Sequence, residues 1–199
     1  FERYGKGTPF VLLHAFPLSR KMWKQQIDVL VEADSHVILP DFRGFGETPI
    51  GSDKTTMEEL ANDIRELLDH LEIEKAIIGG LSMGGYVTLN LYRQHPEKFA
   101  AMILADTSSL ADTEEKREGR FKLIEKTLSQ GMQAIVDEMI PHLTSDYTKA
   151  SNPDLIKQLE KEFLQTDLES AIAALRGMAG RLDHTEMLPE ISVPTLLIF

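Results

Sequence analysis

The sequence predicts an α/β protein with a mostly parallel sheet flanked by helices and with further helices inserted into that core. Three observations predict this class. Short apolar runs alternate with segments of helical periodicity through the first half of the chain. These runs are apolar along their whole length, as in parallel strands that are covered on both faces. Between residues 112 and 186 the strand-like runs stop and only helical patterns remain.

The alternation in the first half can be followed segment by segment. Strands are predicted at 10–13, 37–39, 75–79 and 101–105, and helices at 23–32, at 56–71 and at 86–95. Thr56 and Glu59 have the spacing of a capping box, which predicts the start of the second helix. Pro96 ends the third helix, because proline cannot continue it. The order of strands and helices therefore predicts a parallel sheet.

The helical stretch divides the predicted core in two. We expect a first part of the core at 1–109, a helical cap at 110–187 and a core strand that resumes at 188–199. The run 194–199 is apolar with no turn after it, and the chain opens at Phe1 rather than at methionine. Because native domains rarely end inside a buried strand, we expect a fold that is incomplete at both ends and truncated at the C-terminus. An apolar edge strand at 195–199 would then pair with a second copy of the chain.

Charge and composition exclude several classes of protein. The formal net charge is −11, from 32 acidic and 21 basic residues, which argues against a nucleic-acid or anionic membrane surface. The chain has no cysteine, which excludes disulfides and thiolate metal sites and fits a cytoplasmic location. No apolar run approaches the roughly 18 residues of a membrane span. No histidine pair has metal-ligand spacing with a carboxylate. We expect no metal, no cofactor and a small-molecule partner.

One serine lies among glycines at the end of a predicted strand. Gly80-Leu81-Ser82-Met83-Gly84 matches the pattern G-x-S-x-G in the strand–turn–helix setting that this motif requires. A sharp turn brings the two backbones close together, and a Cβ at either glycine would collide with them. The turn exposes the hydroxyl at a helix N-terminus, where N–H groups stabilise a developing negative charge. Ser82 is thus a candidate nucleophile, the alternative being a glycine-rich turn with a bystander serine.

Four stretches together resemble the α/β-hydrolase superfamily, and within it the capped carboxylesterase and 3-oxoadipate enol-lactonase-like branch. They are Leu-Leu-His-Ala-Phe-Pro at 12–17, Asp-Phe-Arg-Gly-Phe-Gly-Glu-Thr at 41–48, the turn at Ser82, and Val-Pro-Thr-Leu at 193–196. They occur in the family's order and extend over essentially the whole chain. The resemblance is specific for the fold and much less so for the substrate.

The resemblance implies an oxyanion hole beside the nucleophile. Ser82 would attack the substrate, and the backbone N–H groups of Phe16 and Met83 would bind the oxyanion. The family usually has glycine at the position of Ala15, so this loop departs from the common pattern. The resemblance further implies that His14 shapes the same loop.

Two charged residues are expected to have a structural role. Asp41 and Arg43 resemble the turn-stabilising pair of the family's D-x-R-G-x-G motif, and contact with substrate is the less favoured interpretation.

The acid and the base of a serine triad are not evident. In this fold their order is serine, acid, histidine, and the resemblance implies that the acid and the histidine both lie beyond residue 199. Asp106 is an alternative acid, because some members place theirs after the equivalent strand, although a cap or turn aspartate is more common there. His142 and His184 follow Asp106 and are expected to be polar residues of the cap.

The cap contributes apolar side chains that either line an adaptable pocket over Ser82 or form the cap's own core. These are Met132, Met139, Met178, Met187, Phe121, Phe163 and Leu143. The charged run at 112–120 predicts a solvated helix or a hinge.

The sequence therefore predicts a serine hydrolase that cleaves a small carboxylic ester or lactone through an acyl-enzyme on Ser82. Alternatives with the same fold are a cofactor-free haloperoxidase or perhydrolase, a carbon–carbon bond hydrolase and a lyase. A catalytically inactive fragment or a ligand-binding protein is the alternative from another class.

Overall fold

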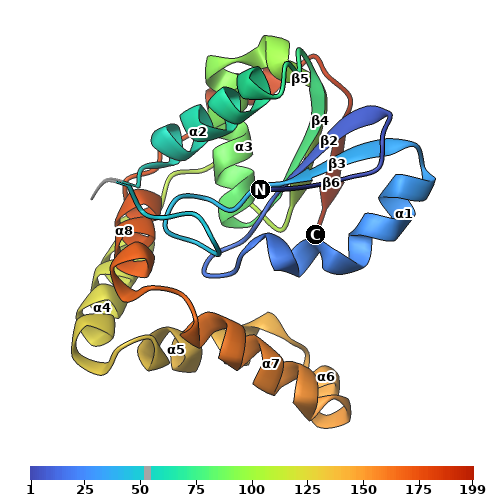
Figure 1. Ribbon diagram of the computed structural model, residues 1–199. Helices are drawn as coiled ribbons and strands as arrows, with labels where there is room; N and C mark the ends of the chain where they lie inside the picture. The colour runs from blue at the N-terminus through green and yellow to red at the C-terminus, as the bar shows by residue number, and fades with distance from the viewer. Residues whose placement is uncertain (52–54) are drawn as a thin grey trace.

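A computed structural model describes residues 1–51 and 55–199 (Figure 1). Within them, six strands form one sheet in the order β1-β3-β2-β4-β5-β6. The strands are β1 (Glu2–Tyr4), β2 (Thr8–Leu13), β3 (Ser35–Leu39), β4 (Ala76–Leu81), β5 (Phe99–Ala105) and β6 (Thr195–Ile198). Only β1 is antiparallel to its neighbour, and every other pairing is parallel. The mostly parallel sheet is confirmed, and the short β1 is an addition that the apolar pattern did not predict.

Helices cover both faces of this sheet (Figure 1). They are η1 (Arg20–Gln26), α1 (Ile27–Glu32), α2 (Met57–His70), α3 (Met83–Gln94) and η2 (Pro96–Lys98). The first predicted helix is thus a 3₁₀ turn followed by a short α-helix. The predicted capping box opens α2: the Glu59 N–H donates to the Thr56 hydroxyl over 3.1 Å, and the Thr56 N–H donates to the Glu59 carboxylate over 3.0 Å.

Alternation along β2 divides the core between the two faces. Val11 and Leu13 belong to the large cluster that packs under α2 and α3. Leu12, between them, points to the other face and belongs to a smaller cluster covered by Trp23 and Ile27. Trp23 therefore packs the first helical segment onto the sheet.

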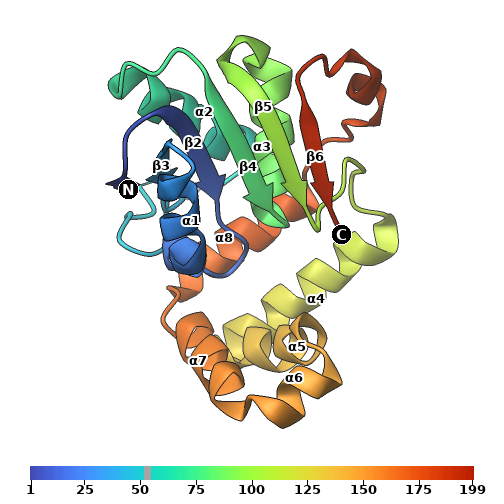
Figure 2. The ribbon, with the colours of Figure 1, turned by 90° about the vertical axis from the view of Figure 1, so that its right-hand side faces the viewer.

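The remaining helices lie between β5 and β6 in the chain. They are α4 (Glu114–Gln130), α5 (Gln133–Leu143), α6 (Asp146–Ser151), α7 (Pro153–Leu164), α8 (Leu168–Ala179) and η3 (Thr185–Glu190). In Figure 2 the arrowheads of β4, β5 and β6 point toward α4 and α8, so these helices lie beyond the carboxyl ends of the strands. Open parallel sheets bind their ligands at this edge. In the described parts of the chain, no helix is both long and apolar enough to cross a bilayer.

Candidate active site

Ser82 occupies the sharp turn between β4 and α3. Its backbone has φ 51° and ψ −110°, a conformation that residues with a side chain rarely adopt. A Cβ added at Gly80 would lie 2.1 Å from the carbonyl carbon of Gly84, and one added at Gly84 would lie 2.3 Å from the carbonyl oxygen of Leu13. Both glycines are therefore required for the close approach of strand and helix, as the sequence predicted.

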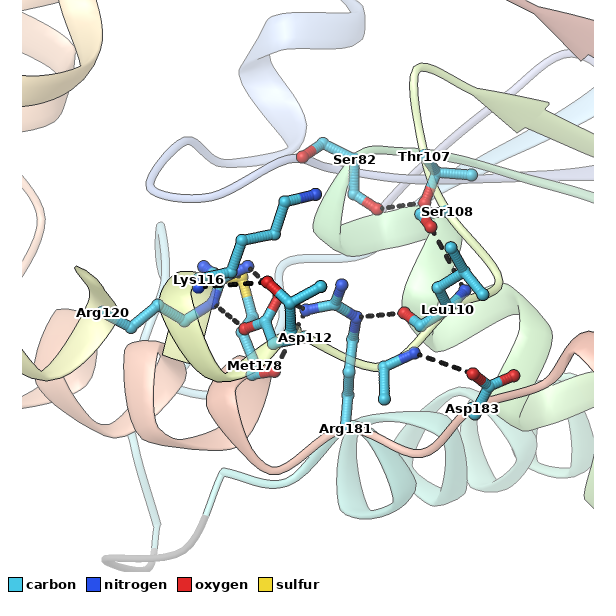
Figure 3. A network of polar contacts seen from close by, with 12 residues as sticks. Ser82, Thr107, Ser108, Leu110, Asp112, Lys116, Arg120, Met178, Arg181 and Asp183 are labelled. Atoms are coloured by element: carbon cyan, nitrogen blue, oxygen red, sulfur yellow. Dashed lines mark hydrogen bonds and ion pairs between the residues drawn. The ribbon is translucent and has the colours of Figure 1, made fainter. Parts of the chain in front are cut away.

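Hydrogen bonds fix this turn to the end of β5. The Ser82 N–H donates to the Ala105 carbonyl over 2.9 Å. The Thr107 hydroxyl donates to the Ser82 carbonyl over 2.8 Å, as Figure 3 shows. No hydrogen bond among residues 1–51 and 55–199 uses the Ser82 hydroxyl, so its oxygen is not held by another side chain.

Of the two predicted oxyanion donors, one follows Ser82 directly in the chain and the other lines the same pocket. Met83 is the first residue of α3, where helix N–H groups lack an intrahelical acceptor. Phe16 lines the same pocket as Ser82. Neither backbone N–H donates to an acceptor elsewhere in the described residues. Neither N–H is therefore committed to an acceptor within the described residues.

His14 holds the loop that carries Phe16. The ring is fully buried, its Nε2 accepts from the Phe42 N–H over 3.0 Å, and its Nδ1 donates to the Ala15 carbonyl over 3.0 Å. Burial lowers the pKa of His14 from its usual 6.5 to about 4. The ring is therefore neutral near pH 7, as these two hydrogen bonds require, and this agrees with the loop-shaping role that the resemblance implies.

The charged residues of the 41–48 loop bind protein groups. The Asp41 carboxylate accepts from the backbone N–H groups of Arg20 over 2.7 Å and Glu47 over 3.0 Å, and it also forms an ion pair with the Arg20 side chain. Arg43 forms an ion pair with Asp63 of α2 over 2.5 Å. These contacts support the structural role expected for Asp41 and Arg43. The charged partner of Asp41, Arg20, was not predicted.

A pocket of about 300 Å³ opens at Ser82, between the sheet and the helices that follow β5. Its apolar walls are formed by Phe16, Tyr86, Leu123, Met139, Leu175 and Met178. The rest of its lining comes from α4 and α5 and consists of Lys116, Gly119, Arg120 and Glu138. Larger hollows of about 550 and 530 Å³ lie near Gly44 and Arg43, and Ser82 lines neither of them.

The cap residues proposed for this pocket divide into four groups. Met139 and Met178 line it, as predicted. Met132 and Phe163 are buried in the core, and Met187 lines a separate hollow. Phe121 and Leu143 are exposed, so for these two neither predicted role holds.

The part of the pocket lining that α4 contributes was not predicted from the sequence. Lys116, Gly119, Arg120 and Leu123 are spaced three, four and seven residues apart, which places them on one face of a helix. This spacing was available in the sequence, but the density of charge at 112–120 favoured a solvated helix. The prediction of a solvated helix or hinge is wrong for Asp112 and Arg120, whose side chains are 1% and 21% exposed.

A buried ionic cluster lies beside the pocket (Figure 3). The Asp112 carboxylate forms ion pairs with Arg120 and Arg181, and the Arg181 Nε donates to the Leu110 carbonyl over 3.1 Å. The Arg181 guanidinium also lies over the ring of Tyr86. Burial raises the pKa of Asp112, but the hydrogen bonds and charges of the two arginines outweigh this and hold the pKa below its usual value. The cluster thus ties both ends of the helical segment to α3.

Within residues 1–51 and 55–199, Asp106 forms no hydrogen bond or ion pair with a histidine. Asp106 is exposed, and its N–H donates to the Ile198 carbonyl over 2.8 Å. His142 is exposed on α5, and His184 is buried with no partner for either ring nitrogen in the described residues. None of the three lines the Ser82 pocket. The role of Asp106 as an alternative acid stays a prediction.

The chain belongs to the α/β-hydrolase fold family, whose pattern residues 8–135 match. A putative non-heme chloroperoxidase from Synechocystis sp. is 31% identical over all of this chain and 75% of its own length. 3-Oxoadipate enol-lactonase 1 from Acinetobacter baylyi is 29% identical over 89% of this chain. The chain spans 64% of that lactonase, less than two thirds of its length.

Solved structures agree with this assignment. A thermophilic esterase from Thermogutta terrifontis, solved with malate bound, is 40% identical and superposes with a TM-score of 0.93 over 98% of this chain and 72% of its own. The enol-lactonase from Burkholderia xenovorans LB400 is 26% identical, with a TM-score of 0.88 over 98% of this chain and 74% of its own. The resemblance stated from the sequence is confirmed at the level of the family.

Proposed function

We propose that this protein is a serine hydrolase that cleaves a small carboxylic ester or lactone through an acyl-enzyme on Ser82. One observation carries the proposal: a serine on a strained turn opens onto a pocket beside two N–H groups that lack acceptors within the described residues. The relatives named as an esterase and an enol-lactonase support this reaction class.

The reaction follows from the arrangement of these groups. The Ser82 oxygen attacks the substrate carbonyl carbon and loses its proton to a general base. The carbonyl oxygen becomes an oxyanion that accepts hydrogen bonds from the Phe16 and Met83 N–H groups. Collapse expels the alcohol, which takes up a proton, and leaves the acyl group on Ser82. Water then attacks the acyl-enzyme, and Ser82 is regenerated with release of the carboxylic acid.

Proton transfer is the part of this mechanism that the pocket does not supply. A hydroxyl needs a base within hydrogen-bond reach to become an effective nucleophile. Among the described residues, no histidine lines the Ser82 pocket. The prediction that an acid and a histidine follow residue 199 is kept as part of the proposal, as is a cytoplasmic location. The reaction itself calls for no cofactor.

The relative named as a chloroperoxidase gives a second candidate. If hydrogen peroxide rather than water attacks the acyl group on Ser82, the product is a peroxyacid, and no further group is required. Both reactions use the same acyl-enzyme. Formation of peracetic acid from acetate and hydrogen peroxide, compared with hydrolysis of an acetate ester, separates the two.

The test is hydrolysis of p-nitrophenyl acetate by the protein and by two serine variants. Ser82→Ala is expected to lower kcat/KM at least a thousandfold, because the nucleophile is lost. Ser108→Ala is the matched control. Ser108 follows Thr107, whose hydroxyl binds the Ser82 carbonyl, and it does not line the pocket. Within the described residues its hydroxyl binds only the Leu110 N–H, over 3.2 Å. Its kcat/KM is expected to stay within a factor of two. Equal rates for Ser82→Ala and the unchanged protein would contradict the proposal.

A further inference from the structure

Gly119 is a glycine inside a helix at a place where the fold does not require one. It lies well inside α4 (Glu114–Gln130), and glycine is among the poorest helix formers. Gly119 is not among the residues with positive φ. A Cβ added there would meet no heavy atom within 4 Å, whereas one added at Gly177 of α8 would lie 1.9 Å from a carbonyl oxygen. Neither backbone conformation nor packing therefore accounts for Gly119.

The space beside Gly119 belongs to the pocket over Ser82. Lys116, Arg120 and Leu123 line the same pocket from the same face of α4, and each has a long side chain. Gly119 is thus a gap in a wall that is otherwise filled. Gly119 is exposed and no heavy atom lies within 4 Å of the gap. A group that extends from the gap toward Ser82 would pass the apolar lining of the same pocket.

We propose that Gly119 is a specificity-determining position, which makes room in the pocket for an apolar alkyl or aryl group of the substrate. The inference rests on the proposed function in placing the substrate carbonyl at Ser82. A side chain at position 119 would project into a pocket of about 300 Å³ and leave less space for that group. The loss should grow with the size of the group, because a larger group depends more on the gap.

The first test compares two esters that differ only in acyl length. For p-nitrophenyl octanoate and acetate, the ratio of kcat/KM values is expected to fall at least tenfold in Gly119→Leu and about twofold in Gly119→Ala. Glu125→Leu is the matched control, because it adds the same side chain at an exposed position of α4 outside the pocket. For this variant, the ratio of kcat/KM for octanoate to that for acetate is expected to stay within twofold of the ratio in the unchanged protein. Gly119→Met gives the same test if Gly119→Leu does not fold.

Two results would overturn the inference. An unchanged ratio in Gly119→Leu would mean that no substrate group uses the gap. Equal losses for both esters in Gly119→Leu and Gly119→Ala would mean that the glycine serves flexibility of α4, since alanine stiffens a helix without filling much space.

A binding measurement separates this inference from the proposed function. The Kd of 2-octanone and of acetone, measured by ligand-observed NMR on proteins that carry Ser82→Ala, needs no catalysis. Addition of Gly119→Leu should raise the Kd of 2-octanone at least tenfold relative to the Kd of acetone. If no ester is hydrolysed but this shift occurs, the proposed function fails and the role of Gly119 stands. If esters are hydrolysed and neither ratio changes, the proposed function stands and the role of Gly119 fails.

Discussion

The guanidinium carbon of Arg181 lies 4.2 Å from the centroid of the Tyr86 ring. Arg181 follows α8, whereas Tyr86 lies on α3 one turn after Ser82 and lines its pocket. Asp112, at the entry to the segment, balances the charge of Arg181. The position of the helices over the pocket is thus coupled to α3, the helix that follows Ser82.

Removal of Asp112 should destabilise the fold strongly. Its side chain and that of Arg181 are 1% and 4% exposed, so Asp112→Ala leaves a buried arginine without its counter-ion. We expect a loss of about 3 kcal/mol in the free energy of unfolding, measured by urea denaturation. Asp154→Ala removes an aspartate that is 90% exposed and should change this free energy by about 0.5 kcal/mol or less. Equal effects of the two changes would contradict a stabilising role for the cluster.

His14 should make stability fall as the pH drops from neutral toward 4. Burial lowers its pKa to about 4 from the usual 6.5, so the unfolded chain binds a proton at a higher pH than the folded one. The contribution is complete above pH 6.5 and is lost as the pH falls through this window, by about 2 kcal/mol at pH 5. Burial also lowers the pKa of His184, which acts in the same direction.

Urea denaturation at pH 7 and pH 5 checks this dependence. His14→Asn should reduce the difference between the two pH values by about 2 kcal/mol, because the titrating group is gone. A difference that His14→Asn leaves unchanged would show that protonation of His14 is not the cause.

The glycines of the turn should be intolerant of a methyl group. Gly84→Ala places a Cβ against the Leu13 carbonyl oxygen, so the strand and helix must move apart. We expect a loss of about 2–3 kcal/mol in the free energy of unfolding, with loss of esterase activity. Gly180→Ala is the control, because the nearest atom to its Cβ would be 3.7 Å away, an ordinary contact. An active and fully stable Gly84→Ala protein would contradict the packing described for the turn.

Studied on its own, the chain of residues 1–199 should pair with a second copy through strand β6. It lies at the edge of the sheet, and Leu196, Leu197 and Ile198 are 54%, 53% and 49% exposed. We propose that an open apolar edge of this kind pairs with the same edge of a second copy. Sedimentation velocity should show a dimer that increases with concentration and is weakened by Leu197→Lys. Monomers at every concentration would be the contrary result.

Much of the sheet could be predicted because most of its strands are recognisable in the sequence as apolar runs. β2, β4 and β5 are covered on both faces, so nearly every position is apolar and each run stands out. β1 could not be predicted this way, since its three residues, Glu2–Tyr4, join the sheet through backbone pairing with β3.

The turn at Ser82 could be predicted from the sequence, whereas most of the pocket around it could not. The turn at Ser82 is local, so glycine spacing within five residues specifies it. The pocket depends on tertiary contacts: Tyr86 contacts Arg181, which lies 95 residues further along the chain. Arg20, at the start of η1, and Asp41, in the loop after β3, likewise form their ion pair through tertiary folding, for which the sequence has no local signal.

Intact mass after treatment with a fluorophosphonate tests most directly whether Ser82 is an activated nucleophile. The reagent forms a covalent bond only with a serine whose oxygen is made reactive by its surroundings. In the protein that includes the acid and the histidine proposed to follow residue 199, we expect one adduct with Ser82 intact or with Ser108→Ala, and none with Ser82→Ala. A folded protein that takes up no reagent, or a Ser82→Ala variant that reacts as fast as the unchanged protein, would contradict the proposal that Ser82 carries the reaction.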